Sequence, residues 1–482
     1  MKIKELLKDI DYESVNLQLD MEITSFAIKD SECKENSIFF AIKGRSCDGK
    51  KYINNAIKRG AKVIITEEFV NNCSVSQIKV KNVREAINRI CCTFYGNPQK
   101  KLKKIAVIGT NGKTTVCELI AKILNNAGIP CGKIGTLGAE YGEKHIDTGF
   151  TTPDTPQLYA IMNDMVENGI KVVCMELSAH AIYYNKADFK FDLSVFTNCT
   201  PEHLDFFEDF NEYRETKLSA FTCKKTKIAI VNGDDLLGKQ IACMRNRGVI
   251  TYGIDDPADV FAVDFYEDEN GMSFLMNLFD SLYEINSPYF GKFNLYNFLA
   301  VSTACALFGA KTEFIANQLQ NAVAVKGRME KISNKINLFI DYAHTPDGLK
   351  NALETLKNIK KDANLICVFG CGGNRDKSKR EVMGEISGEY ADFTVITSDN
   401  PRFEDEQSII SQIEGGIRRK TKNYITISKR DQAIDYAVQR ANCGDYVLIA
   451  GKGAEEYQEQ MGVKRKFSDR EIAQRAIRNK YD

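Results

Sequence analysis

The sequence predicts an α/β protein of three domains, and three observations support this prediction. The chain has 482 residues, which is too many for one ordinary core at roughly 100–200 residues per domain. Short apolar runs alternate with segments of helical periodicity, a pattern typical of parallel sheets. Polar and glycine residues follow several of these runs. We expect a small α/β domain at residues 1–98, a central domain with a mainly parallel sheet at 99–326 and a C-terminal α/β domain at 327–482.

The first of these blocks predicts a β-α-β module. SIFFAIKG (37–44) and KVIIT (62–66) are strand-like, and KYINNAIKRG (51–60) carries a helical stripe that ends at Gly60. We expect this module to end near residue 98.

The second block opens with a strand, IAVIG (105–109), and continues into an amphipathic helix. Gly128 is the stop signal of that helix, and further short strands are predicted at 172–177, 192–198 and 228–234. The apolar residues of the helix recur at the spacing of one helical face: Val116, Leu119, Ile120, Ile123, Leu124 and Ala127.

The third block repeats one pattern four times, a strand followed by a polar or glycine-rich loop. The repeats are LFIDYAH (338–344), LICVFGCGGNRD (365–376), TVITSDNPR (394–402) and YVLIAGKGAE (446–455). Ligands of open α/β sheets bind at the carboxyl ends of the strands. We therefore expect these four loops to share one site.

Composition excludes some classes of function. The chain has 65 basic and 65 acidic side chains, so no net charge draws it to nucleic acid or to an anionic membrane. The longest uncharged segment, 298–310, is too short to span a bilayer, and the N-terminus lacks the apolar core of a signal peptide. The 15 cysteines include no CxxC pair. We expect a cytoplasmic protein with reduced, mostly buried thiols.

The stretch AVIGTNGKTT (106–115) predicts a phosphate-binding loop. It is two residues shorter than the pattern G-x-x-x-x-G-K-[ST], but it lies between a strand and a helix, as that motif requires. Backbone N–H groups and the helix N-terminus attract phosphate oxygens, Lys113 can reach the β- and γ-phosphates, and Thr114 can bind Mg²⁺. The residues of the loop are Gly109, Thr110, Asn111, Gly112, Lys113, Thr114 and Thr115.

The loop GTNGKTT resembles that of the Mur ligase family, and other motifs follow that family's order over nearly the whole chain. They are TTPDT (151–155), MELSAH (175–180), FTNCTPEHLDFF (196–207), GKFNLYN (291–297), GRME (327–330), DYAHTPD (341–347), GCGGNRDKSKR (370–380), SDNPR (398–402) and GKGAE (451–455). The resemblance implies a UDP-binding first domain, a central P-loop-type ATPase domain and a Rossmann-like C-terminal domain. It also implies ATP-dependent addition of meso-diaminopimelate to UDP-N-acetylmuramoyl-L-alanyl-D-glutamate, in cytoplasmic peptidoglycan precursor synthesis, by a monomer.

The resemblance also implies a metal site. Glu176 and His203 match the family's metal-site residues, which together with Thr114 would hold Mg²⁺. Lys217 lies on the apolar stripe of the helix DFNEYRETKLSAF (209–221), and burial favours the neutral amine, which can react with carbon dioxide. From the residues alone, a lysine that reaches solvent or pairs with a carboxylate is the better interpretation. Resemblance implies instead that Lys217 is carbamylated and binds a second Mg²⁺, and that Lys113, Glu176, His203 and Lys217 are catalytic.

Resemblance assigns the substrate ends as well. Ser31 lies in the segment similar to the family's uridine-binding region, where Glu32 stands at a common arginine position. Thr151, Thr152, Ser178 and Lys186 match residues that touch the muramoyl dipeptide, Lys186 again in place of arginine. Asn294, Arg328, Asp341 and His344 match positions around adenine, ribose and phosphate, although each could be a turn or cap residue.

The acceptor is expected at Arg375, Asp399, Asn400, Arg402, Gly451 and Glu455. The Arg402 guanidinium can hold the second carboxylate of diaminopimelate, which lysine lacks, with two parallel hydrogen bonds. Alternatives to this interpretation are a ligase that adds L-lysine, a folylpolyglutamate-type ligase and a nucleotide-binding paralogue without activity.

Overall fold

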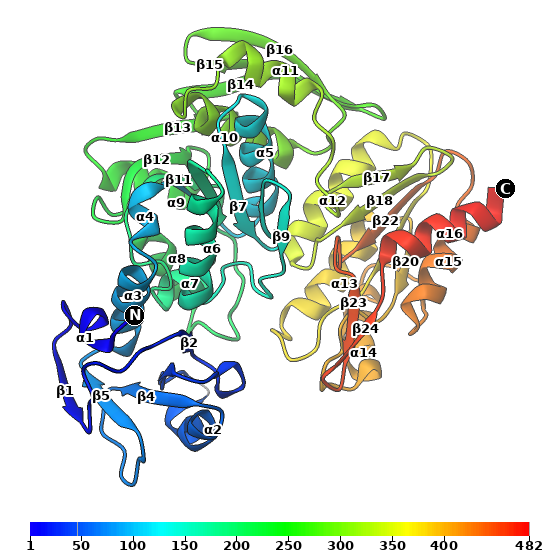
Figure 1. The fold of residues 1–482 in the computed structure, drawn as a ribbon. Helices are drawn as coiled ribbons and strands as arrows, with labels where there is room; N and C mark the ends of the chain where they lie inside the picture. Colours follow the sequence, from blue (N-terminus) through cyan, green and yellow to red (C-terminus); the bar gives the residue numbers. More distant parts are fainter. Residues whose placement is uncertain (46, 482) are drawn as a thin grey trace. The chain divides into compact units, whose positions relative to one another are not determined.

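The computed structural model describes residues 1–45 and 47–481. The chain is divided into two compact units. The first unit comprises Met1–Ile108, Leu124–Ser194 and Thr216–Ile228, and the second comprises Gly109–Ile123, Val195–Glu215 and the chain from Ala229 onward. Both are built of sheets covered by helices, as the sequence predicts (Figure 1). The boundaries at residues 98/99 and 326/327 stay predictions.

A five-stranded sheet of order β1-β5-β4-β3-β2 belongs to the first unit. All its pairs are parallel except β1 with β5. Alternate residues of the strands face opposite ways, so Ile38 and Phe40 pack with α1 and α3, whereas Phe39 packs with α2. The predicted β-α-β module is present within this larger sheet. Its elements are β1 (Tyr12–Val15), β2 (Ser25–Ala27), β3 (Ser37–Phe40), β4 (Ala61–Thr66), β5 (Ser76–Val80), α1 (Ile3–Leu6), α2 (Ile53–Lys58) and α3 (Val83–Phe94), with 3-10 turns at Asp30–Glu32 and Gly49–Tyr52.

An 11-stranded sheet has the order β16-β15-β14-β13-β12-β11-β6-β10-β7-β8-β9. Its pairs β10 with β6, β10 with β7 and β12 with β13 are parallel. Its two margins are antiparallel, at β7-β8-β9 and at β14-β15-β16. The strands are β6 (Lys103–Ile108), β7 (Cys131–Gly135), β8 (Gly138–Tyr141), β9 (Lys144–Ile146), β10 (Val172–Glu176), β11 (Phe191–Phe196), β12 (Thr226–Asn232), β13 (Val249–Gly253), β14 (Val260–Asp268), β15 (Gly271–Leu278) and β16 (Ser281–Ser287).

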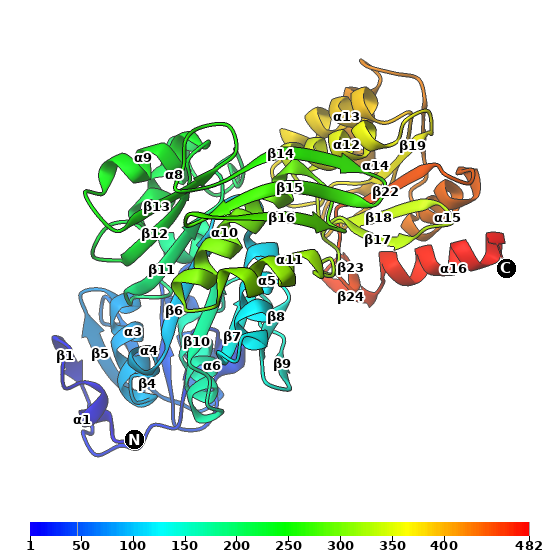
Figure 2. The same cartoon turned by 90° about the horizontal axis from the view of Figure 1, so that it is seen from above.

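The three long strands β14, β15 and β16 form an antiparallel ribbon that the sequence analysis did not find; they run side by side in Figure 2. Hydrophobic and polar residues alternate only in part along these strands. The helices between residues 98 and 320 are α4 (Pro98–Lys101), α5 (Lys113–Asn126), α6 (Thr155–Glu167), α7 (Ala179–Tyr183), α8 (Phe210–Ser219), α9 (Leu236–Met244), α10 (Lys292–Leu307) and α11 (Thr312–Gln320). The predicted helix after the phosphate-binding loop is confirmed as α5, and Gly128 follows it with φ 78°.

A six-stranded sheet of order β17-β18-β22-β19-β20-β21 lies in the second unit and is parallel except at β17. Phe339, Cys367 and Phe369 face one set of helices, α12 to α14, whereas Leu338 and Val368 face α15 and α16. The elements are β17 (Glu330–Ser333), β18 (Asn337–Asp341), β19 (Leu365–Phe369), β20 (Phe393–Ile396), β21 (Tyr424–Thr426), β22 (Tyr446–Ala450), α12 (Pro346–Ile359), α13 (Lys379–Tyr390), α14 (Glu406–Ile417), α15 (Arg430–Arg440) and α16 (Asp469–Tyr481), with a hairpin of β23 (Tyr457–Gln460) and β24 (Val463–Lys466).

Two other sequence predictions concern membrane spans and cysteines. Within residues 1–45 and 47–481, no helix combines the length and the hydrophobicity that crossing a bilayer requires. The 15 cysteines are free thiols, and eight of them are buried.

Candidate active site

The phosphate-binding loop connects β6 to α5, and its glycines are there because neighbouring side chains come very close. A Cβ on Gly109 would lie 1.8 Å from Oγ1 of Thr197. A Cβ on Gly112, whose φ is 86°, would lie 2.5 Å from Oδ1 of Asn297. Only glycine tolerates both the contact and the positive φ.

The loop is held in shape by its own polar groups. Nζ of Lys113 donates to the carbonyl oxygens of Gly109 (3.0 Å) and Thr110 (2.7 Å). Oγ1 of Thr110 lies 3.1 Å from the Tyr213 hydroxyl, and Asn111 N donates to Oδ1 of Asn198 at 2.9 Å. The lysine therefore lies folded over the loop, in the position from which it can turn toward a phosphate.

Two histidines share one carboxylate beside this loop. Nε2 of His344 lies 3.3 Å from Oε1 of Glu202, and Nε2 of His203 lies 3.7 Å from Oε2. Burial alone would raise the pKa of Glu202. The hydrogen bond from His344 and the positive charges of His203, His344 and Lys113 outweigh burial and hold that pKa well below its usual range. Burial lowers the pKa of His203, and the Glu202 charge offsets part of this effect.

Arg328 and Asp341, two further residues predicted to bind the nucleotide, lie in the same unit as the loop. Nη2 of Arg328 donates to Oγ1 of Thr114 at 2.8 Å, and the Arg328 guanidinium lies 4.4 Å from the centre of the Tyr342 ring. Asp341 accepts from Met329 N and from Ala343 N, the latter an Asx turn as the motif DYAH predicts. Burial raises the pKa of Asp341, against the nearby charge of Arg328.

Asn294 is buried at the start of α10, where it contacts Asn297, a residue that borders the phosphate-binding loop. Its amide donates to Phe290 O at 2.8 Å, and its Oδ1 accepts from Asn297 at 2.9 Å. Since Asn297 borders Gly112, Asn294 is joined to the loop through one side chain.

Glu176 lies in the first unit, at the end of β10, with 2% of its surface exposed. Its carboxylate accepts from Thr136 N (2.8 Å) and from the Thr136 hydroxyl (3.2 Å). The Thr152 hydroxyl donates to the Glu176 carbonyl oxygen at 2.8 Å, and Ser178 N donates to the same hydroxyl. Oγ1 of Thr151 lies 3.0 Å from Oγ1 of Thr136. Glu176, Thr151, Thr152 and Ser178 are thus brought together.

The Lys217 side chain is 1% exposed. It lies on the same buried face of α8 as Tyr213, and Phe221, just beyond the end of the helix, is buried as well. The periodicity that places this lysine on the apolar side of its helix therefore agrees with its burial.

Lys186 and Glu32, the two departures from the family pattern, both have charged partners. Nζ of Lys186 lies 2.7 Å from Oδ1 of Asp154 and 5.2 Å from the centre of the Phe150 ring. Glu32 pairs with Lys29 at 3.3 Å, next to exposed Ser31. Lys29 lies 5.3 Å from the centre of the Phe150 ring.

The predicted acceptor residues gather at the carboxyl ends of β20 and β22. Nδ2 of Asn400 donates to Oε2 of Glu455 at 3.0 Å, and buried Lys452 donates to both Asn400 and Glu455. Gly451 has φ 114°, and a Cβ there would lie 2.9 Å from Oδ2 of Asp399. Four predicted residues, Asp399, Asn400, Gly451 and Glu455, therefore meet as expected for loops of one sheet edge.

The loop after β19 is connected to these acceptor residues through Arg402. Nη1 of Arg402 donates to Gly373 O at 2.8 Å, whereas Arg375 is exposed and donates only to the adjacent Asn374 O among the described residues. Arg380 has no exposed side-chain surface and binds both carboxylate oxygens of Glu404, at 3.0 and 3.2 Å. This pair fixes the two loops to each other.

Comparisons with known proteins assign the chain to a family. Three family descriptions match the chain: "Mur ligase family, catalytic domain" at residues 22–95, "Mur ligase middle domain" at 107–305 and "Mur ligase, glutamate ligase domain" at 327–453. A relative from Alkaliphilus oremlandii, named UDP-N-acetylmuramoyl-L-alanyl-D-glutamate--2,6-diaminopimelate ligase, is 39% identical over 98% of both chains. The chain belongs to the Mur ligase family. A relative of the same name from Clostridioides difficile is 38% identical over 99% of both chains.

Solved structures give the same result for the Mur ligase fold. The structure of a UDP-N-acetylmuramoyl-L-alanyl-D-glutamate--2,6-diaminopimelate ligase matches with a TM-score of 0.69 and 28% identity, over 100% of this chain and 99% of that one. A MurF ligase from Thermotoga maritima in complex with ADP matches with a TM-score of 0.65 over 96% of this chain and 99% of that one, at 20% identity. The likeness to the MurF ligase supports the fold alone.

Membership of the Mur ligase family makes the chain a ligase that forms carbon–nitrogen bonds. Three residues of the site were not predicted individually: Glu202, Lys452 and Arg380. Each lies within a motif that resembles the family's, FTNCTPEHLDFF, GKGAE and GCGGNRDKSKR respectively, so its position was available as a signal. The pairing of Arg380 with Glu404 was not, because the two residues are 24 positions apart.

Proposed function

We propose that this chain uses ATP to join meso-diaminopimelate to UDP-N-acetylmuramoyl-L-alanyl-D-glutamate in cytoplasmic peptidoglycan precursor synthesis. We expect it to act as a monomer on small molecules, with no role for nucleic acid or a membrane. The observation that carries the proposal is the full-length similarity to relatives that bear this enzyme's name. The contacts of Asn400 with Asp399 and with Glu455, three residues expected to bind the acceptor, also support it.

The reaction that we propose has two chemical steps. The γ-carboxylate of the D-glutamyl residue attacks the γ-phosphorus of ATP, which gives an acyl phosphate and ADP. The amine of diaminopimelate then attacks the acyl carbon, expels phosphate and loses a proton. Lys113 neutralises charge on the phosphoryl group that is transferred, and Arg328, Asp341 and Asn294 hold the nucleotide. Thr151, Thr152, Ser178 and Lys186 orient the dipeptide, and Ser31 contributes to the UDP end. Much of the rate enhancement would come from this positioning.

The donor atoms of the chain fit Mg²⁺. Thr114 and Glu176 offer oxygen atoms, which Mg²⁺ prefers, and His203 offers a nitrogen. Residues 1–45 and 47–481 contain no group of three or more His, Cys, Asp or Glu side chains that could hold a metal. Mg²⁺ in nucleotide sites usually keeps several waters and is also held by substrate phosphates. When bound, Mg²⁺ supplies positive charge beside the transferred phosphoryl group.

Lys217 is the residue that we propose to be carbamylated. Its burial supports this, because burial favours the neutral amine from which a carbamate forms. Replacement Lys217→Ala should abolish phosphate release, and added bicarbonate should not restore it. Full activity of this variant would exclude the carbamate, and intact-mass measurement in bicarbonate buffer would detect the added group directly.

The test of the proposed function is phosphate release with the dipeptide precursor, ATP and Mg²⁺. Three arms are compared: meso-diaminopimelate, L-lysine and no acceptor. We expect sustained release with diaminopimelate only. Release with lysine alone would assign the acceptor to the lysine-adding alternative, and no release in any arm would favour a nucleotide-binding paralogue without activity.

A further inference from the structure

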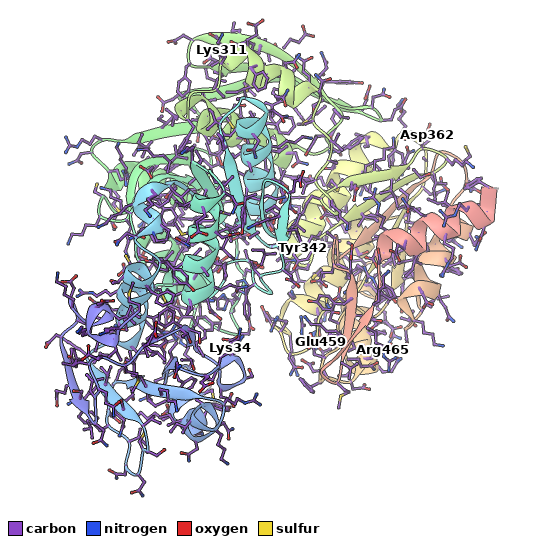
Figure 3. The ribbon with its side chains drawn as sticks, viewed as in Figure 1. Lys34, Lys311, Tyr342, Asp362, Glu459 and Arg465 are labelled. Atoms are coloured by element: carbon purple, nitrogen blue, oxygen red, sulfur yellow. The ribbon has the colours of Figure 1, made fainter. Side chains whose placement is uncertain are left out.

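A carboxylate of the chain itself lies against the guanidinium that is expected to hold the acceptor. Oε2 of Glu459 is 3.5 Å from Nε of Arg402, and about a fifth of each side chain is exposed. Glu459 is at the end of β23, on the hairpin that also carries Arg465 (Figure 3). Nη1 of Arg402 is already engaged by Gly373 O, so the edge of the guanidinium that includes Nε is the one that faces Glu459.

The backbone holds Glu459 in this position. Arg402 N donates to Glu459 O at 3.1 Å, and Met461 N donates to Arg402 O at 2.7 Å, so that Arg402 is bridged to the hairpin. Glu459 N also donates to Oδ1 of Asn400 at 2.9 Å. These backbone hydrogen bonds fix Glu459 beside Arg402, so the contact between the two side chains is part of the fold.

Two other carboxylates at this edge are already engaged. Oε2 of Glu455 accepts from Lys452 and from Asn400, so its charge is balanced by a buried ammonium group, and Oδ1 of Asp399 accepts from Asn400 N. Glu459 is the carboxylate that lies against Arg402. An acceptor carboxylate needs two neighbouring N–H groups of the guanidinium for a bidentate pair. The Nε edge that Glu459 faces offers one such pair, so an acceptor carboxylate that binds this edge shares or displaces Glu459.

We propose that Glu459 competes with the distal carboxylate of the acceptor for Arg402 and thereby weakens the binding of diaminopimelate. This inference rests on the proposed function, because it requires an acceptor with a second carboxylate. Glu459 acts through Arg402 and is a positioning residue for acceptor binding, so its effect falls on KM and not on kcat.

The test is Glu459→Gln, which removes the charge and keeps the shape. The KM for meso-diaminopimelate should fall roughly two- to five-fold, the range of a partly exposed ion pair. The kcat and the KM for the dipeptide should not change. The matched control is Glu456→Gln, because Glu456 lies on the same segment but pairs with Lys326. In an Arg402→Ala background, Glu459→Gln should have no effect on the KM, since the group for which it competes is gone.

An unchanged or higher KM in Glu459→Gln would overturn the inference; a higher value would mean that Glu459 helps to bind the acceptor. The wild-type chain separates this failure from failure of the proposed function. If the wild type uses diaminopimelate and the variant's KM does not fall, only the competition is wrong. If the wild type does not use diaminopimelate, both proposals fail before any variant is compared.

Discussion

The predicted nucleotide loop and the proposed acceptor site are organised in opposite ways. The loop at residues 109–115 is one contiguous stretch whose glycines, lysine and threonines lie together because they are neighbours in sequence. The acceptor site is assembled from loops after three strands and from the β23–β24 hairpin, and contacts such as Arg380 with Glu404 hold it. A contiguous motif is therefore visible in the sequence alone, whereas a composite site depends on pairs that form only on folding.

The largest expected effect tests the contiguous nucleotide loop. Lys113→Ala should lower kcat by roughly 10²- to 10³-fold, because a positive charge aimed at the transferred phosphoryl group is lost. Phosphate release with saturating substrates measures it. Lys122→Ala, an exposed lysine of the same helix, is the matched control and should leave kcat unchanged. A loss of less than three-fold in Lys113→Ala would contradict the role of the loop.

The second-largest expected effect tests the proposed acceptor site, which is assembled from several loops. Arg402→Ala should raise the KM for meso-diaminopimelate roughly 10- to 100-fold, since a charge-assisted hydrogen-bonding partner is removed. The KM for the dipeptide should change far less, because that substrate is expected at other residues. Steady-state kinetics with each substrate varied in turn measures both values, and Arg478→Ala, an exposed arginine of α16, is the control. Equal effects on the two KM values would remove the acceptor assignment.

Periodicity and spacing were enough to predict much of the fold. They located β3, β6, β10, β18 and β22 and the helix α5, because each is a short apolar run or a single helical stripe with clear end signals. The ribbon of β14 to β16 was missed because its strands carry exposed apolar residues such as Val263, Tyr266 and Leu282, which break a simple alternation. The hairpin of β23 and β24 is mostly exposed and polar, so no hydrophobic pattern marks it.

Some site residues could also be predicted from the sequence, and others could not. That the loops carrying Asp341, Asn400 and Glu455 share one sheet edge follows from the rule for parallel strands, whereas the residues themselves were assigned by resemblance. Glu459 and Arg380 could not be assigned in this way, because a charged residue in a polar segment is usually solvated. Only the folded chain brings their partners, Arg402 and Glu404, to them.

The third prediction concerns the pair that fixes the acceptor loops. The pKa of Glu404 is lowered from its usual 4.5 to about 2, chiefly by the hydrogen bond from the Arg380 guanidinium. Because the folded-state pKa is depressed, the stabilisation is complete above about pH 5 and is lost as the pH falls toward 2. Glu404→Gln should lower the free energy of unfolding by about 3 kcal/mol at pH 7, since the buried Arg380 charge loses its partner.

Urea unfolding of the full chain at pH 7 and pH 3 measures this effect. The difference between wild type and Glu404→Gln should shrink at pH 3, where the wild-type carboxylate approaches protonation. Glu389→Gln, an exposed glutamate of α13 that pairs with Lys420, is the control and should show little difference at either pH. A difference that is the same at both pH values would mean that the ion pair does not stabilise these loops.

The smallest expected effect concerns Lys186, the residue that the family resemblance aligns with an arginine position. Its ammonium group already has a carboxylate partner, Asp154, and an aromatic neighbour, Phe150. An arginine at this position could keep both contacts, so Lys186→Arg should change the KM for the dipeptide by less than about three-fold, whereas Lys186→Ala should raise it more. Dipeptide kinetics of the two variants tests this. A large loss in Lys186→Arg would mean that the point charge of the ammonium group is itself required at this position.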